Sequence, residues 1–346
     1  MGNITKSEDC LVLNVWTPTV RTDYPLKAPL KPVMFWIYGG GLIVGSAFQQ
    51  QYNASLLATN DVVVVSVNYR LGPFGFLYGD REDAPGNVGF YDQLLALKWV
   101  RENIHLFGGD RDQITIFGES AGSKSVSAHI ISPLSKGLFK RAIMQSGALF
   151  YNKHRYPMVK SEALLVSKQL AKNMNCSEEE EDNWLECLRG FEAQELMDGY
   201  DTRRQLSALS DTEFLPMNAQ NMFENKLFNK DLDIMAGVMR NEGSIQSQSL
   251  VKPNLTEKDF NEFVTIIDAF YHNFDEKLVT DFYLKSIDKN SSDALKWAEY
   301  DMFGDLMTTC PTYRFAKAYG QLGGAGGVYF YEQTYQRKSF LDEKVY

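Results

Sequence analysis

The sequence predicts an α/β fold in which helices flank a central, mostly parallel β-sheet. Short apolar runs rich in β-branched residues alternate with longer amphipathic segments, a pattern typical of a parallel sheet. The 346 residues are 44% hydrophobic and 13% aromatic, enough for one large core. No internal repeat or low-complexity linker divides the sequence, so we expect residues 1–346 to form a single domain.

Short apolar runs bounded by turn residues predict the strands. They are Leu11–Trp16, Val33–Tyr38, Val62–Asn68, Ile114–Phe117, Arg141–Gln145, Leu232–Val238 and Gly327–Tyr331. Helices are expected after several of them, including Gln93–Glu102, which has amphipathic spacing. From about Ser161 to Leu306 the sequence is mainly helical and more polar.

Ser120 lies between Gly118 and Gly122, at the junction of the predicted strand Ile114–Phe117 and a helical segment. On a tight strand-to-helix turn a serine is held in a strained conformation that exposes its hydroxyl, and side chains two positions away would collide. The N–H of Ala121, at the start of the helix, is then a natural donor to a developing oxyanion. A G-x-S-x-G pattern also arises by chance in ordinary loops, so the motif alone leaves that alternative open.

A second glycine motif follows the predicted strand Val33–Tyr38, which runs into Gly39-Gly40-Gly41. Without Cβ atoms the backbone can approach a substrate oxygen closely, so Gly40 and Gly41 are the other candidate oxyanion donors. Taken alone, this segment could equally be a flexible loop after a core strand. Together the two motifs supply a nucleophile and anion-binding amides, which acyl transfer requires.

Further sequence blocks accompany the two motifs in a characteristic order. They are Ser7–Trp16, Trp36–Gly41, Asn68–Arg70, Gly75–Leu77, Gly86–Gly89, Asp92–Gln93, Phe107–Asp110, Gly118–Gly122 and Gln145–Gly147. In this order they resemble the type-B carboxylesterase/cholinesterase family, over nearly the whole chain. The resemblance implies an α/β-hydrolase fold, a Ser–Glu–His triad in chain order, and hydrolysis of carboxylic esters through an acyl-enzyme.

The resemblance also implies the roles of several acidic residues. Asp233–Ser244 is similar to the family's apolar strand and the Glu-Gly pair after it, which makes Glu242 the acid that orients the catalytic imidazole. A solvated loop charge is the alternative for this residue. Glu119 resembles a supporting residue that hydrogen-bonds within the site. Arg70 and Asp92 resemble a buried structural ion pair.

The histidine of the triad is not found where the resemblance places it. The family carries a His-Gly motif after the block that resembles Gly327–Tyr331, and no histidine lies between that block and Tyr346. Of the four histidines, only His272 follows Glu242, and its segment has the pattern of a surface helix. We therefore expect the general base to come from outside this chain, with His272 as the alternative.

The four cysteines agree with this expectation. Cys176 and Cys187 flank a short acidic run, and the resemblance implies a disulfide between them. Cys10 and Cys310 resemble family cysteines whose partners lie upstream and downstream of this chain. We therefore expect an α/β-hydrolase domain that is incomplete at both termini, with at most trace ester turnover by this chain alone.

Charge and targeting signals limit the partners. A net charge of −9 argues against a nucleic-acid-binding surface. No signal peptide or membrane span is recognisable, whereas the family is mostly secreted or membrane-anchored, so we expect a secreted parent protein. Sequons that fit this expectation begin at Asn3, Asn53, Asn175, Asn254 and Asn290. A homodimer and a membrane anchor outside this chain are further possibilities for the parent.

Two departures from the family pattern bear on the substrate. Thr202–Leu206 lacks the aromatic residues of a choline-ester acyl pocket, and Ile245 stands where choline-selective members usually carry an aromatic. We therefore expect a general carboxylesterase acting on a small-molecule ester, with an acetylcholinesterase-like enzyme as one alternative. The other is a non-catalytic cholinesterase-like interaction module, against which Ser120 and Glu242 argue. No metal cluster, phosphate loop or dinucleotide motif appears, so no cofactor or metal is expected.

Overall fold

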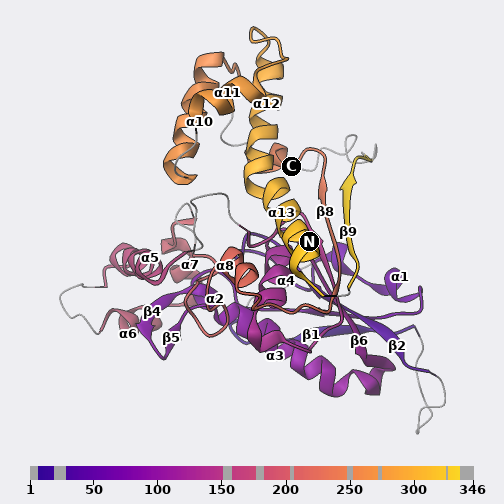
Figure 1. Cartoon of the computed structure of the whole chain (residues 1–346). Helices are drawn as coiled ribbons and strands as arrows, with labels where there is room; N and C mark the ends of the chain where they lie inside the picture. Colours follow the sequence, from indigo (N-terminus) through magenta and orange to yellow (C-terminus); the bar gives the residue numbers. More distant parts are fainter. Residues whose placement is uncertain are drawn as a thin grey trace.

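The structure of the chain, a computed structural model, consists of an α/β body and a helical lobe that projects from it (Figure 1). It describes residues 7–18, 29–150, 158–176, 183–202, 206–247, 252–271, 275–324 and 326–335.

A seven-stranded sheet with the order β1-β3-β2-β6-β7-β8-β9 forms the centre of the body. Its strands are β1 (Leu13–Trp16), β2 (Lys31–Ile37), β3 (Val63–Val67), β6 (Gly109–Glu119), β7 (Arg141–Gln145), β8 (Asp233–Met239) and β9 (Val328–Gln333). All neighbouring pairs from β3 to β9 are parallel, and β1 is antiparallel to β3. The predicted α/β fold with a mostly parallel sheet is confirmed, and each predicted strand has its counterpart here.

The hairpin formed by β4 (Tyr78–Arg81) and β5 (Ala84–Pro85) was not predicted. Gly79, Asp80 and Pro85 are residue types that strands disfavour, so nothing in the local pattern indicates pairing. β6 is also longer than predicted, because it includes a polar first half that precedes the apolar stretch. In that polar half, the pairing with β2 is limited to Gly109 opposite Lys31.

Helices connect and cover the strands. They are α1 (Ser55–Ala58), α2 (Gly72–Phe76), α3 (Val88–Asn103), α4 (Ala121–Ile131), α5 (Lys160–Asn173), α6 (Trp184–Arg189), α7 (Ala193–Gly199), α8 (Ala219–Glu224), α9 (Gly243–Gln246), α10 (Glu257–Tyr271), α11 (Glu276–Tyr283), α12 (Ser292–Gly304) and α13 (Cys310–Leu322). The predicted helix Gln93–Glu102 lies within α3. None of the helices in the described ranges is long and apolar enough to cross a membrane.

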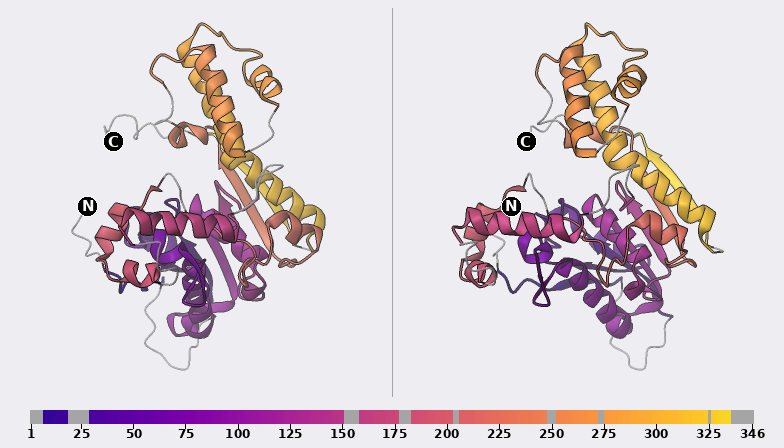
Figure 2. Two further views of the ribbon diagram at one scale, coloured as in Figure 1. Left: turned by 90° about the vertical axis from the view of Figure 1, so that its left-hand side faces the viewer. Right: turned by 60° about the vertical axis from the view of Figure 1, so that its left-hand side comes forward.

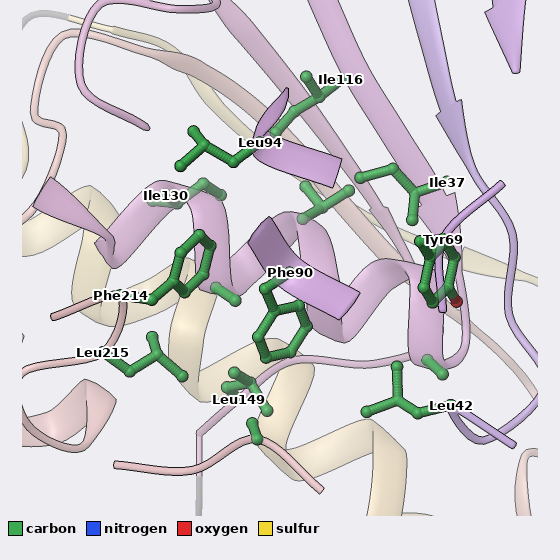
Figure 3. Close-up of a cluster of buried hydrophobic side chains, with 14 of the residues drawn as sticks. Ile37, Leu42, Tyr69, Phe90, Leu94, Ile116, Ile130, Leu149, Phe214 and Leu215 are labelled. Atoms are coloured by element: carbon green, nitrogen blue, oxygen red, sulfur yellow. The ribbon is translucent and has the colours of Figure 1, made fainter. Parts of the chain in front are cut away.

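The main core packs the sheet against α3, α4 and α13. Val33, Phe35 and Ile37 of β2 are fully buried in it, and β3 is buried along its whole length. Figure 3 shows part of this cluster, with Ile37 and Ile116 from the sheet and Leu94 and Ile130 from the helices. Each large apolar side chain buried this way contributes about 2 kcal/mol. The carboxyl ends of β2 and β6 are therefore held by a densely packed layer.

The helical lobe, α10 to α12, has a separate apolar cluster that includes Phe260, Val264 and Leu295. α12 continues through a π-helix (Asp305–Thr309) into α13, which packs on β8 and β9 (Figures 1 and 2). Pro311 lacks an N–H and its ring crowds the carbonyl four residues earlier, which explains the wider turn just before it. We call this continuous helix, residues 292–322, the connecting helix. The assignment of the whole chain to one domain remains a prediction.

The structure contains the Cys176–Cys187 disulfide, which joins the region after α5 to α6. Cys10 and Cys310 are unpaired, and Cys310 is exposed.

Candidate active site

Ser120 forms the bend between β6 and α4. Its backbone has φ 56° and ψ −119°, a combination that residues other than glycine rarely adopt. The Ser120 N–H donates to the carbonyl of Gln145 at the end of β7, at 2.9 Å, and the Ser120 carbonyl accepts from the N–H of Lys124, also at 2.9 Å. These bonds hold the strained bend, so the serine stands at the carboxyl end of β6 and the N-terminus of α4.

The glycines on either side of Ser120 permit close backbone contacts. A Cβ added at Gly118 would lie 2.6 Å from the carbonyl of Gly122, and one added at Gly122 would lie 2.0 Å from the oxygen of Ile37. A Cβ at Gly147, in the loop after β7, would lie 2.8 Å from the oxygen of Ser120. Gly147 belongs to one of the blocks that resemble the family, and its packing against the Ser120 backbone is a physical reason for glycine at this position.

The loop Gly39–Gly41 after β2 lies directly against the serine. A Cβ at Gly39 would lie 2.5 Å from the carbonyl oxygen of Glu119 and 3.0 Å from the Cβ of Ser120. Gly40 and Gly41 have φ of 112° and 66°, which favour glycine, and the Gly40 carbonyl accepts from the N–H groups of Ile43 and Val44. The structure therefore brings together the two glycine motifs that the sequence separates.

Three backbone amides remain without acceptors beside Ser120. Within the described ranges, the N–H groups of Gly40, Gly41 and Ala121 donate no hydrogen bond to another group of the chain. Two of them belong to the glycine loop and the third opens α4. Unused amides at a helix N-terminus and in a glycine loop suit an anionic oxygen.

Glu242 follows β8, in the turn that leads into α9. One strand, β7, separates β6 from β8, so the strands that lead to Ser120 and Glu242 are two strand spacings apart, about 10 Å. One carboxylate oxygen, Oε1, accepts a hydrogen bond from the N–H of Met239 at 2.6 Å. This bond fixes the carboxylate within its own turn, on the same edge of the sheet as the serine.

The electrostatics indicate that Glu242 and Glu119 share one site. Glu119 stays in contact with solvent, yet partial desolvation and the negative charge of Glu242 both raise its pKa. Burial and the charge of Glu242 also raise the pKa of Tyr331 in β9. Burial and the charge of Glu119 raise the pKa of Tyr52, in the short helix Gln50–Tyr52. Tyr331 and Tyr52 are site neighbours that sequence reasoning missed, because they come from distant segments.

Glu119 differs from its expected role in one respect. Its carboxylate accepts no hydrogen bond from any described residue, whereas the resemblance implies a bond within the site. One carboxylate oxygen, Oε2, lies 2.8 Å from the position that a Cβ on Gly39 would take. Glu119 therefore contacts the glycine loop by packing.

Neither histidine in the described ranges can reach Ser120. His129 lies nine residues along α4, about 13 Å further along the helix axis. It is fully buried, and its ring nitrogens bond Ser135 Oγ at 2.7 Å and Gln93 Oε1 at 3.2 Å. His105 precedes β6, whereas Ser120 follows it, and the 11 residues of β6 span about 35 Å. His154 and His272 lie outside the described residues.

Three further residues named from the sequence have clear positions. Arg70 forms a two-pronged ion pair with Asp92, with N···O distances of 2.8 and 2.7 Å. The resemblance implies this pair, but only the Asp92 carboxylate is buried, since the Arg70 side chain is 40% exposed. Ile245 on α9 is 79% exposed, so its side chain is free to face a ligand or a further part of the protein. Of the Thr202–Leu206 segment, residues 203–205 lie outside the described residues.

Known proteins provide an independent comparison. The model of the carboxylesterase family matches residues 1–345. The chain is 39% identical to an acetylcholinesterase of Danio rerio over 336 residues, which cover 92% of this chain and 52% of the relative. It is 37% identical to cholinesterase 1 of Branchiostoma lanceolatum over 95% of both chains, and 42% identical to the pyrethroid hydrolase Ces2a of Mus musculus over 65% of this chain and 39% of the relative. The chain spans about half the length of the acetylcholinesterases it matches.

The family match covers almost every residue, and the sheet and the serine bend agree with it. The chain therefore belongs to the carboxylesterase family.

Proposed function

We propose that the whole protein hydrolyses carboxylic esters through an acyl-enzyme formed on Ser120. The hydroxyl of Ser120 attacks the ester carbonyl, and the amides of Gly40, Gly41 and Ala121 stabilise the oxyanion. The observation that carries the proposal is the contact between the glycine loop and the serine bend, which places unused amides beside the nucleophile. The ester C–O bond breaks, and the alcohol leaves with the proton that the general base took from Ser120. Water then hydrolyses the acyl-enzyme, which releases the carboxylic acid and restores the serine.

The general base is an imidazole supplied from outside this chain, with His272, which lies outside the described residues, as the alternative. Glu242 orients it and stabilises the imidazolium that forms when Ser120 loses its proton. The strands that lead to Ser120 and Glu242 lie about 10 Å apart with β7 between them, and this spacing supports one imidazole ring between the two side chains. Without this ring the chain by itself retains only the contribution of the oxyanion amides, so its turnover is at most trace.

We infer that the protein is a general carboxylesterase rather than an enzyme selective for choline esters. Ile245 and the Thr202–Leu206 segment offer no aromatic ring for a quaternary ammonium group. An acetylcholinesterase-like enzyme is the second candidate, favoured by the identity to relatives named acetylcholinesterase and cholinesterase. The ratio of kcat/KM for p-nitrophenyl acetate and acetylthiocholine separates the two, because only a choline-selective enzyme prefers the cationic ester.

The parent protein is proposed to be secreted. The sequon residues Asn53, Asn254 and Asn290 are all exposed, so each could carry a glycan without disturbing the core. A homodimer and a membrane anchor belong to the same proposal for the parent protein. Glycan occupancy on protein recovered from the medium of cells that express the complete coding sequence tests the secretion.

Ester hydrolysis by the full-length protein tests the function. Ser120→Ala is expected to abolish p-nitrophenyl acetate hydrolysis and covalent labelling by a fluorophosphonate, and Glu242→Gln is expected to reduce kcat by about a hundredfold or more. Unimpaired turnover by Ser120→Ala would refute the acyl-enzyme. A folded full-length protein that neither turns over esters nor reacts with the fluorophosphonate would instead support the interaction module.

A further inference from the structure

The turn that carries Glu242 is in direct backbone contact with the connecting helix. A Cβ added at Gly304 would lie 2.6 Å from the backbone nitrogen of Gly243 and 3.3 Å from the Cβ of Glu242. In the other direction, a Cβ added at Gly243 would lie 1.9 Å from the carbonyl oxygen of Tyr300. Contacts this short leave no room for a methyl group, so α12 and the Glu242 turn meet with no side chain between them.

Backbone conformation does not account for glycine at position 304. Gly304 has φ −61° and ψ −44°, an ordinary helical conformation that any residue adopts. Glycine inside a helix is about 1 kcal/mol less favourable than alanine. Gly304 therefore weakens the connecting helix locally, and the close approach to Gly243 is what the missing side chain permits.

The connecting helix is attached to β8 near both ends of that strand. The hydroxyl of Tyr319 in α13 accepts from the N–H of Leu232, just before β8, at 3.0 Å, and donates to the carbonyl of Asn229 at 2.8 Å. From Gly304 to Tyr319 the helix rises about 22 Å, and the seven residues of β8 span about 23 Å. The helix thus runs along the whole of β8, in the opposite direction (Figure 2).

We propose that Gly304 is a positioning residue for Glu242. The connecting helix, held at Leu232 and pressed against Gly243, sets the position of the Glu242 turn relative to β8 and so relative to Ser120. This inference rests on the proposed ester hydrolysis, in which Glu242 orients an imidazole. A displacement of about 1 Å in such a group can reduce the rate about a hundredfold.

Gly304→Ala in the full-length protein tests the inference. The methyl group pushes the Glu242 turn away, so kcat for p-nitrophenyl acetate is expected to fall ten- to a hundredfold, with KM within about twofold. The acid limb of the kcat/KM profile is expected to move to lower pH, because a displaced carboxylate stabilises the imidazolium less. Gly320→Ala is the matched control: it lies in the same helix, exposed, and its Cβ would be 3.7 Å from the nearest atoms, those of Val328, so it is expected to keep wild-type kinetics.

A double-mutant comparison shows whether the effect passes through Glu242. In a Glu242→Gln background, Gly304→Ala is expected to change kcat less than twofold, because the group that it displaces no longer acts. If Gly304→Ala does not fold, Tyr319→Phe provides the second variant: it frees the helix at Leu232 and places no atom near Glu242. We expect a smaller fall in kcat and the same direction of pH shift.

The outcomes separate the two proposals. An active wild-type with an equally active Gly304→Ala variant, or the same loss in the Glu242→Gln background, would overturn the positioning role alone. A folded wild-type without esterase activity would overturn the proposed function, and the positioning role with it.

Discussion

Gly122 lies directly against Ile37, and a Cβ at Gly122 would come within 2.0 Å of the Ile37 carbonyl oxygen. The contact joins the first turn of α4 to the last residue of β2. The glycine loop begins two residues after Ile37 and the serine precedes Gly122 by two. One backbone contact therefore sets the distance between the proposed nucleophile and two of its proposed oxyanion donors.

Gly122→Ala is expected to separate these two elements. Because the added methyl group would collide with the backbone of Ile37 and Tyr38, α4 or β2 has to move, and we expect a hundredfold or larger loss of kcat/KM in the full-length protein. Fluorophosphonate labelling and the unfolding midpoint would be measured together. Gly320→Ala is again the control, and wild-type labelling by a folded Gly122→Ala protein would contradict the expectation.

Local chemistry explains how much of the site was predictable. Ser120 and its glycines occupy a few consecutive positions, and a strand-to-helix bend requires those residue types. The motif can therefore be recognised from the sequence alone. The parallel sheet was predictable for a similar reason, since runs such as Val63–Val67 are apolar throughout.

Contacts between distant segments were not predictable in this way. In the sequence Gly304 looks like any helical glycine, and only the fold brings α12 against Gly243. Likewise, Tyr52 comes near Glu119 only because β2 and β6 are neighbours in the sheet. The unbonded carboxylate of Glu119 shows the same limit, because a resemblance carries over a residue type but not its partners.

The Cys176–Cys187 disulfide is expected to stabilise the fold mainly by restricting the unfolded chain. Its cysteines are separated by 11 positions, and closing a loop of that size is worth about 3 kcal/mol. Cys176→Ser with Cys187→Ser should lower the free energy of unfolding by about that amount in urea titrations. The single variant Cys10→Ser, at an unpaired cysteine, is the control, and equal stability of the double variant and the wild type would contradict the loop-closure argument.

Glu299 in α12 is expected to destabilise the fold near neutral pH. It is 1% exposed, and neither carboxylate oxygen has a hydrogen-bond partner in the part of the chain that the structure describes. Burial, aided by the charge of Asp259 and opposed by that of Lys252, raises the pKa of Glu299 from 4.5 to about 7. Since the folded state holds the proton more tightly than the unfolded state, this residue's contribution to stability falls as pH rises from about 4.5 to 7.

Glu299→Gln removes that ionisation. We expect it to raise the free energy of unfolding by about 3 kcal/mol at pH 7.5 and to have little effect at pH 4.5. Urea titrations at the two pH values measure the difference. The exposed Glu224→Gln in α8 is the control, and a Glu299→Gln variant less stable than wild type at pH 7.5 would show that the buried carboxylate has a favourable partner.

His129 is expected to have the opposite pH dependence. Burial lowers its pKa from 6.5 to about 3, and the neutral ring is held by Ser135 and Gln93. The unfolded chain therefore binds a proton below pH 6.5 that the folded chain rejects, so the stability contributed by the neutral ring is complete above pH 6.5 and is lost as pH falls toward 3. At pH 5 the loss amounts to about 2 kcal/mol.

We expect His129→Gln to be less stable than its parent at pH 7.5, because it loses ring hydrogen bonds. Between pH 6.5 and 5, however, its free energy of unfolding is expected to fall by about 2 kcal/mol less than that of its parent. Urea titrations in the Glu299→Gln background isolate this contribution, since Glu299 otherwise titrates in the same range with the opposite sign. An unchanged slope between pH 6.5 and 5 would mean that the folded protein protonates His129 as readily as the unfolded chain does.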